Sequence, residues 1–194
     1  MTALPIDGIR FEFDDSWVIA KWDDSVWYRE RFERLKGTLG GKDEGTKAVD
    51  VIGMRDDVPY LFEVKDFRGF AIENKARHVE ELPLELGLKA RDTVAGLLGV
   101  TALGVHDELP ARWIRAVTQL GRAVHVVAWI AEDAARPGEH AHKRDARESQ
   151  RLRSMKQKLA WLTQRVWITD PLRRPVVPGV VATSLPGAGP ARRT

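Results

Sequence analysis

The sequence predicts an α/β protein in which a mixed β-sheet is flanked by helices on both faces. The stretch Lys47–Arg68 contains two apolar runs separated by a polar turn at Arg55, Asp56 and Asp57, which is the pattern of a β-hairpin. Residues 124–131 are apolar on both faces, as is typical of a strand that is covered on both sides. Amphipathic segments with helical spacing precede and follow these strands, so helices are available to cover the sheet.

Length and composition favour one soluble domain. The 194 residues are enough for a single buried core, with 43% hydrophobic and 30% charged residues and a net charge of +3. The absence of cysteine excludes disulfides, thiolate chemistry and zinc-finger sites. The chain begins without a signal-peptide pattern and has no apolar run of the ~20 residues that a membrane helix needs. We therefore expect a cytoplasmic protein without a membrane partner.

The expected elements at the start of the chain are a hairpin and a helix. Residues Ile9–Phe13 and Trp17–Trp22 alternate between apolar and polar side chains, which predicts an N-terminal β-hairpin. A helix over Val26–Lys36 follows, capped by one of the polar residues 23–25. A single domain is predicted over residues 1–177, and the Pro/Gly-rich residues 178–194 are expected to form a partly disordered tail.

The second half of the chain predicts further helices and one more strand. A polar segment ending at Pro83 is expected to be helical or lid-like. The remaining predicted elements are helices over Leu84–Leu103, Arg112–Leu120 and Lys143–Leu162, and a short strand over Val166–Thr169.

Three charged residues in the predicted hairpin form a candidate catalytic set. Side chains alternate along a strand, so Glu63 and Lys65 share one face, and Asp50 on the partner strand joins them if the register places it opposite. Two carboxylates can hold a hard divalent cation, and a neighbouring lysine can position or deprotonate water. An ordinary solvated sheet face also carries such residues, but the apolar neighbours Tyr60, Leu61 and Phe62 exceed what an exposed strand requires.

The set Asp50, Glu63 and Lys65, with thirteen residues from the aspartate to the glutamate, resembles the signature of the PD-(D/E)XK nuclease superfamily. This superfamily includes restriction-endonuclease-like and Holliday-junction-resolvase-like enzymes. The family's proline is absent, since Val49 precedes the aspartate, but that proline is not a catalytic group. The resemblance covers roughly residues 24 to 170, and it implies a restriction-endonuclease-like fold.

The resemblance also implies a chemistry. Asp50, Glu63 and the backbone carbonyl of Val64 would bind Mg²⁺, with Mn²⁺ as a substitute, and Lys65 would orient the attacking water or hold it as hydroxide. Members of the family often place a further metal-supporting glutamate on the first helix. Glu30 and Glu33 are the candidates for this role, although both point away from the buried stripe and a solvated position is favoured for each.

The predicted helix over residues 143–162 has a strong cationic excess. Among its basic residues, Arg147, Arg151 and Lys158 are candidate contacts to a nucleic-acid backbone. A solvated helix face accounts for the same pattern equally well. No sequence-reading motif is present, so specificity would come from loops, from nucleic-acid structure or from a partner. By analogy with such small nucleases we expect a homodimer, or the effector subunit of a defence complex (antiphage defence, for example) or of a repair complex.

The sequence therefore predicts a metal-dependent nuclease that hydrolyses phosphodiester bonds, with DNA favoured over RNA as substrate. The alternative is a catalytically silent nuclease-like subunit that binds or scaffolds a nucleic-acid-processing complex. A small-molecule hydrolase or transferase on another α/β fold is a third class, but the sequence contains none of the corresponding motifs.

Overall fold

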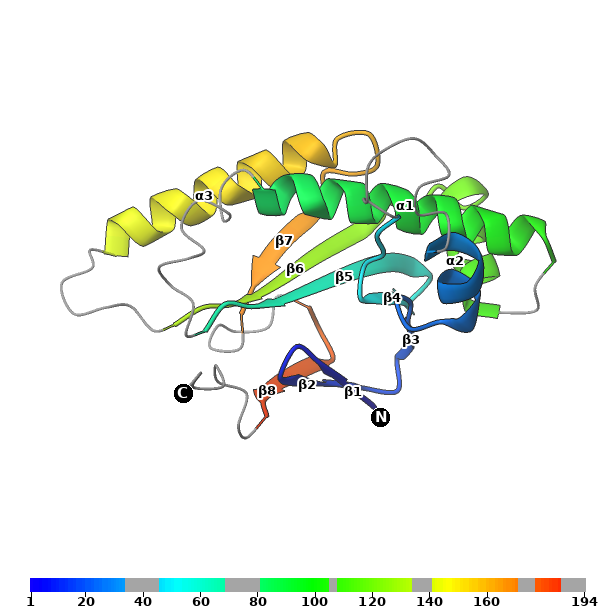
Figure 1. The fold of residues 1–194 in the computed structure, drawn as a ribbon, viewed down its shortest axis with the longest axis horizontal. Helices are drawn as coiled ribbons and strands as arrows, with labels where there is room; N and C mark the ends of the chain where they lie inside the picture. Colours follow the sequence, from blue (N-terminus) through cyan, green and yellow to red (C-terminus); the bar gives the residue numbers. More distant parts are fainter. Residues whose placement is uncertain (34–45, 69–80, 105–107, 134–140, 171–176, 186–194) are drawn as a thin grey trace.

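Two β-sheets stack on one another, and helices cover the outer face of the larger sheet (Figure 1). The computed structural model describes residues 1–33, 46–68, 81–104, 108–133, 141–170 and 177–185. The larger sheet contains, in spatial order, β3 (Trp17–Lys21), β4 (Val51–Arg55), β5 (Val58–Asp66), β6 (His125–Ala131) and β7 (Val166–Thr169). The smaller sheet contains β1 (Thr2–Ile6), β2 (Ile9–Phe13) and β8 (Val180–Ser184), with β2 in the centre. The helices are η1 (Tyr28–Phe32, π-helical), α1 (Leu82–Ala102), α2 (Glu108–Thr118) and α3 (Ala141–Lys158).

The larger sheet is mixed, as the sequence predicts. Strands β3, β4 and β5 are antiparallel, whereas β5, β6 and β7 are parallel. The expected hairpin is present as β4 and β5, with Val51 opposite Phe62. Its turn residues Asp56 and Asp57 both have positive φ, 51° and 57°, which matches the twist of a two-residue hairpin loop.

The smaller sheet differs from the expected N-terminal hairpin. Strands β2 and β3 were predicted to pair with each other, but β2 pairs with β1 and β8, while β3 pairs with β4 in the larger sheet. The N-terminal hairpin is instead β1–β2, closed by Asp7 (φ 46°) and Gly8 (φ 73°). Strand β8 lies within the segment that was expected to be a tail, so residues 180–184 belong to the folded domain.

Side-chain alternation along the strands separates two cores. One core lies between the larger sheet and the helices and includes Leu61, Leu86 and Trp113. The other lies between the two sheets and includes Phe62, Val64 and Trp129. The prediction of helices on both faces is therefore wrong. A strand that is apolar on both faces must be covered twice, but its composition does not specify whether a helix or a second sheet provides the cover.

Helix α1 is held closely against α3. A Cβ atom placed on Gly87 would lie 3.2 Å from Cβ of Lys158, so the absence of a side chain at this position permits the approach. Ser25, one of the residues expected to cap the first helix, accepts a hydrogen bond at its Oγ from the Tyr28 N–H at 3.2 Å. The predicted end of this helix beyond Glu33 lies outside the described residues, as does nearly all of the polar segment before Pro83.

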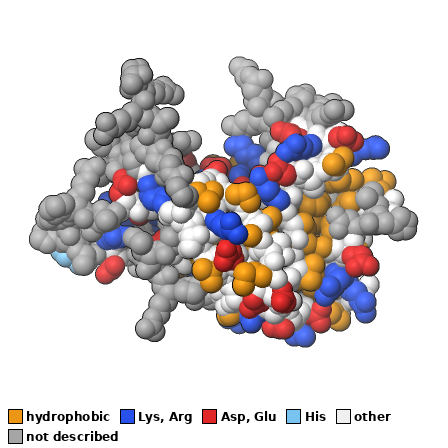
Figure 2. Space-filling view, turned by 90° about the horizontal axis from the view of Figure 1, so that it is seen from below, with side chains coloured by type: hydrophobic (Ala, Val, Ile, Leu, Met, Phe, Trp, Pro, Cys, Tyr) orange, Lys and Arg blue, Asp and Glu red, His pale blue; other side chains and the backbone are white. Residues whose placement is uncertain are grey.

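The outer face of the smaller sheet has a mixed surface. Figure 2, viewed from this side, shows basic and acidic side chains interspersed with hydrophobic ones. Strand alternation places Arg10, Glu12 and the exposed Val181 on this face, since their neighbours on β2 and β8 that point inward are buried. Among the helices described, none combines the length and the apolar character needed to cross a membrane.

Candidate active site

The candidate site lies on the helix-covered face of β5. Leu61 belongs to the core beneath the helices, whereas Phe62 and Val64 belong to the core between the sheets. Since successive side chains point to opposite faces, Glu63 and Lys65 lie on the same face as Leu61, toward α1. Their positions follow directly from the apolar pattern of β5, in which every second residue is buried between the sheets.

Asp50 reaches the same place from the residue before β4. The pairing of β4 with β5 ends at Val51 and Phe62, and β5 continues past this pair. The backbone of Val64 therefore has no partner in β4. The carboxylate of Asp50 takes this position: its Oδ2 accepts a hydrogen bond from the Val64 N–H at 2.6 Å. The structure thus brings Asp50 to the edge of β5 at which Glu63 and Lys65 lie.

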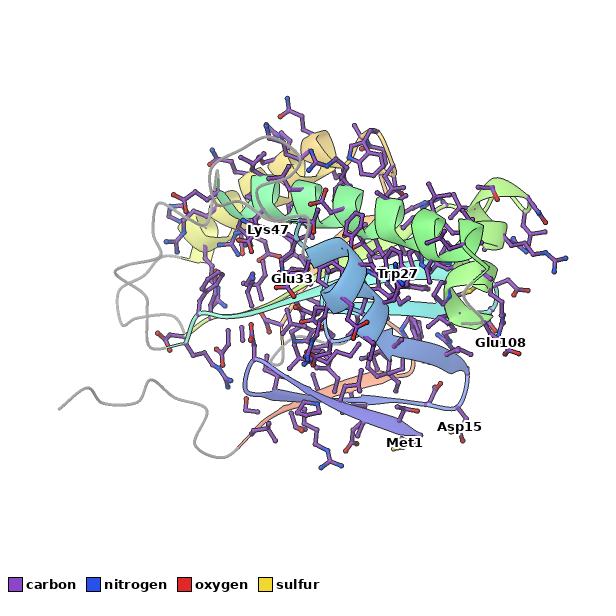
Figure 3. The ribbon with its side chains drawn as sticks, turned by 45° about the vertical axis from the view of Figure 1, so that its right-hand side comes forward. Met1, Asp15, Trp27, Glu33, Lys47 and Glu108 are labelled. Atoms are coloured by element: carbon purple, nitrogen blue, oxygen red, sulfur yellow. The ribbon has the colours of Figure 1, made fainter. Side chains whose placement is uncertain are left out.

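Polar residues of α1 hold the segment that leads to Asp50. The Lys47 N–H donates to Oδ2 of Asp92, and the Val49 N–H donates to Oγ1 of Thr93, both at 3.0 Å. Asp92 and Thr93 are buried. Because these bonds replace water on a buried backbone, they fix the approach of residue 50 to the sheet. Lys47 lies beside α1 in Figure 3, and its charge contributes to lowering the pKa of Glu85.

Two lysines contact the buried carboxylates. Nζ of Lys65 lies 2.9 Å from Oε1 of Glu63 and 3.1 Å from Oε1 of Glu85, which is on α1. Nζ of Lys89, also on α1, lies 2.7 Å from Oε1 of Glu63 and 3.9 Å from Oδ1 of Asp50. Glu85 and Lys89 are four residues apart and so project from the same side of α1. Carboxylates and ammonium groups therefore alternate across the site.

Burial raises the pKa values of the acidic groups. It raises the pKa of Glu63 to about 7, and the neighbouring charge of Asp50 adds to this, although Lys89 and Lys65 oppose it. Burial likewise raises the pKa of Asp50, against the lowering by Lys89 and by the Val64 N–H. Burial alone would lower the pKa of Lys65, but the carboxylates of Glu63 and Glu85 outweigh it and raise that pKa. Lys65 is therefore protonated in this arrangement.

Asp23 is a third carboxylate that the sequence analysis treated only as a possible helix cap. It follows β3, and the adjacent Trp22 N–H donates to the backbone carbonyl of Asp50 at 2.9 Å. Burial raises the pKa of Asp23, and its charge in turn contributes to raising the pKa of Asp50. Of the two glutamates considered for a metal-supporting role, Glu30 is exposed and Glu33 is half-buried. Asp23 lies two residues after the end of β3, and β3 pairs with β4; this pairing is long-range, so no local sequence signal places Asp23 near Asp50.

The donor set for a divalent cation consists of two carboxylates and one carbonyl. Within the described ranges, no three side chains of His, Cys, Asp or Glu come together as a metal site. Asp50 and Glu63 do come together, and Oε2 of Glu63 is buried with no hydrogen-bond partner in the structure described. The carbonyl of Val64 points to the same edge of β5 as the Val64 N–H. Asp50 lies at this edge, because its carboxylate accepts the hydrogen bond from that N–H. Oxygen donors of this kind suit Mg²⁺ or Mn²⁺.

The three basic residues predicted on α3 do not share one environment. Arg147 and Lys158 are exposed. Arg151 is buried, only 6% exposed, and donates a hydrogen bond from a terminal nitrogen to Oε1 of Glu132 at 2.8 Å. Arg151 is therefore an internal ion-pair partner rather than part of an exposed cationic face, which argues against its predicted contact with nucleic acid. The contacts predicted for Arg147 and Lys158 stay predictions.

Comparisons with known proteins add little to this geometry. The chain is 25% identical over 117 residues to the cysteine–tRNA ligase of Neisseria meningitidis serogroup A, an alignment that covers 50% of this chain and 17% of that protein. The chain thus spans less than a fifth of the length of the relative that it matches. No family model matches the chain, and no solved structure matches it significantly. The identity is too low and the coverage too small to show a family.

Proposed function

We propose that this protein is a metal-dependent nuclease with a restriction-endonuclease-like fold, which hydrolyses phosphodiester bonds of nucleic acid. The observation that carries the proposal is the convergence of Asp50 and Glu63, from neighbouring strands, on the edge of β5 with Lys65 beside them. The resemblance to the PD-(D/E)XK signature rests on these same residues. A mixed α/β sheet with this site at its helix-covered face supports it further.

The residues fit a divalent cation and have separate roles in the proposed chemistry. Asp50, Glu63 and the carbonyl of Val64 would hold Mg²⁺ or Mn²⁺, which when bound neutralises charge on the phosphate and activates water. Oε2 of Glu63, which accepts no hydrogen bond from the residues described, supplies an oxygen for the cation. Lys65, protonated and anchored by Glu63 and Glu85, would donate a hydrogen bond that orients the attacking water or the phosphate. Lys65 is less suited to accept a proton from water and so hold it as hydroxide, because Glu63 and Glu85 raise its pKa and keep it protonated.

The proposed substrate is DNA ahead of RNA, because the resemblance is to enzymes of restriction and junction resolution. Arg147 and Lys158 on α3 are exposed, and we propose that they contact phosphates of the substrate. A homodimer, or a subunit within a defence or repair complex, would supply the specificity for which the described chain has no sequence-reading motif. These assignments extend the proposal and depend on the nuclease activity.

The test is cleavage by the purified protein of supercoiled plasmid, single-stranded DNA and RNA, with Mn²⁺ or Mg²⁺ and with chelator. We expect metal-dependent cleavage that falls at least about 100-fold in Glu63→Gln and in Lys65→Met, because both remove a group from the reacting centre. Asp66→Asn is the matched control: Asp66 is the next residue of β5, points to the other face and pairs with Arg68. Equal activity in the wild type and in all three variants would contradict the assignment of the site.

One observation favours a second candidate function. Lys89 lies 2.7 Å from Glu63 and 3.9 Å from Asp50, so both carboxylates have a cationic neighbour without a metal, as a silent binding or scaffolding subunit would require. That function predicts no cleavage of any of the three substrates by the wild type, together with binding of nucleic acid that Glu63→Gln leaves unchanged. A gel-shift assay in parallel with the cleavage assay separates the two candidates.

A further inference from the structure

Lys89 occupies the position between the two carboxylates where a cation would be held. Its ammonium contacts Oε1 of Glu63 at 2.7 Å and faces Oδ1 of Asp50 at 3.9 Å, and its side chain is 12% exposed. Its partners are the same two acids that the proposed metal would need.

The two lysines of the site differ in which carboxylates would still contact them if Glu63 bound a metal ion. Lys65 has a second carboxylate, Glu85, at 3.1 Å. The carboxylates that contact Lys89 are Glu63 and Asp50. A divalent cation bound by those acids would therefore take both from Lys89, while Lys65 would keep one partner. Like charges at contact distance also repel strongly where water is scarce.

The backbone that carries Lys89 cannot easily withdraw. Gly87, one half-turn earlier, approaches Lys158 of α3 so closely that an added Cβ would lie at 3.2 Å. Asp92 and Thr93, one turn later, bind the segment that enters β4. Any rearrangement on metal binding must consequently fall on the four-carbon side chain of Lys89, which has the rotatable bonds to make it.

We propose that Lys89 is a tethered counter-ion that competes with divalent cations for Asp50 and Glu63, so that it weakens the metal affinity of the site and stabilises the site in the absence of metal. This inference rests on the proposed function, since it concerns the same metal-binding acids. Lys89 is in this sense a positioning residue: it keeps the two acids paired with an ammonium group until a metal enters.

The experiment is Mn²⁺ binding to the full chain by isothermal titration calorimetry, with thermal unfolding in chelator as a second measurement. Lys89→Met removes the charge and keeps an apolar stem of similar length. We expect it to bind Mn²⁺ at least about tenfold more tightly than the wild type, and to unfold at a lower temperature in chelator. Mn²⁺ should then raise its unfolding temperature by more than it raises that of the wild type.

Two further variants serve as controls. Lys65→Met removes the other ammonium and should change Mn²⁺ affinity by less than Lys89→Met does, because Lys65 is shared with Glu85. Lys89→Gln keeps a donor for Glu63 without the charge and should tighten Mn²⁺ binding in the same direction. It replaces Lys89→Met if that variant does not fold.

The outcomes separate the inference from the proposed function. If the wild type binds Mn²⁺ and both Lys89 variants bind it equally or more weakly, competition by Lys89 is refuted and the metal site stands. If neither the wild type nor any variant binds Mn²⁺, the metal-dependent function fails and the inference fails with it. Binding by the Lys89 variants alone would support the inference and show that the wild-type affinity is set by this lysine.

Discussion

The buried carboxyl of Glu63 makes the stability of the metal-free protein depend on pH. Its side chain is 2% exposed, and burial raises its pKa from an ordinary value of 4.5 to about 7. Between these two values the native state retains a proton that the unfolded chain has released. The free energy of unfolding must therefore fall as the pH rises through this window, and it levels off above about pH 7.

The magnitude follows from the size of the change. Raising the pKa from 4.5 to about 7 is a difference of about 2.5, and each unit of pKa corresponds to about 1.36 kcal/mol. Glu63 alone is thus expected to cost up to about 3.4 kcal/mol of stability above pH 7, relative to acid conditions. Glu63→Gln, which is close to the protonated carboxyl in shape and carries no titrating proton, should lose this dependence.

The assay is urea unfolding of both proteins in chelator at closely spaced pH values from about 4 to about 8. The free energies of unfolding of the wild type and of Glu63→Gln should be similar at about pH 4. They should differ increasingly as the pH rises, with Glu63→Gln the more stable protein. Glu85→Gln is the control, because the pKa of Glu85 is lowered by Lys65 and Lys89 against its burial, and its own contribution is lost only as the pH falls. A constant difference between wild type and Glu63→Gln at every pH would refute the reasoning.

Two further predictions concern neighbouring residues with opposite environments. Leu97→Ala, at a fully buried position of α1, should lower the free energy of unfolding by about 3 kcal/mol, whereas Leu98→Ala, 47% exposed, should cost less than about 1 kcal/mol in the same denaturation assay. Arg151→Ala should cost about 2 kcal/mol, because it leaves Glu132 without its 2.8 Å partner. Arg153→Ala, at an exposed position of the same helix, should change stability by no more than about 0.5 kcal/mol. Equal losses within either pair, measured by circular dichroism, would contradict the burial on which the prediction depends.

The sequence was most informative where the determinants are local. The hairpin of β4 and β5 was predicted with its turn, because two apolar runs and two aspartates in succession specify it within about twenty residues. The shared face of Glu63 and Lys65 followed from strand alternation alone. The position of Asp50 required only the hairpin register, and the Asp50–Val64 hydrogen bond is a consequence of where β4 begins.

Long-range pairing could not be predicted in the same way. The partners of β2 and β3 lie in different sheets, and β8 comes from the other end of the chain. The Asp7-Gly8 pair is a local signal for the β1–β2 hairpin. Lys89 was not predicted as a partner of Glu63, because the two meet only when α1 packs over β5.

Arg151 illustrates an error that the helical period itself could have prevented. It lies four residues before Met155 and eight before Leu159, and both of these are fully buried. Positions at this spacing share one face of a helix, so Arg151 had to lie on the buried side of α3. The cationic composition of the segment by itself does not show where each charge lies around the helix.

The order of the strands along the chain has a consequence for biosynthesis. Among the described strands, β2 is synthesised before every strand of the larger sheet, whereas its neighbour β8 is synthesised after all of them. Until then the apolar surface formed by Trp17, Phe62 and Trp129 has only part of its cover. Because unprotected apolar surface of this kind promotes aggregation, a nascent chain stalled before β8 is a natural substrate for chaperones.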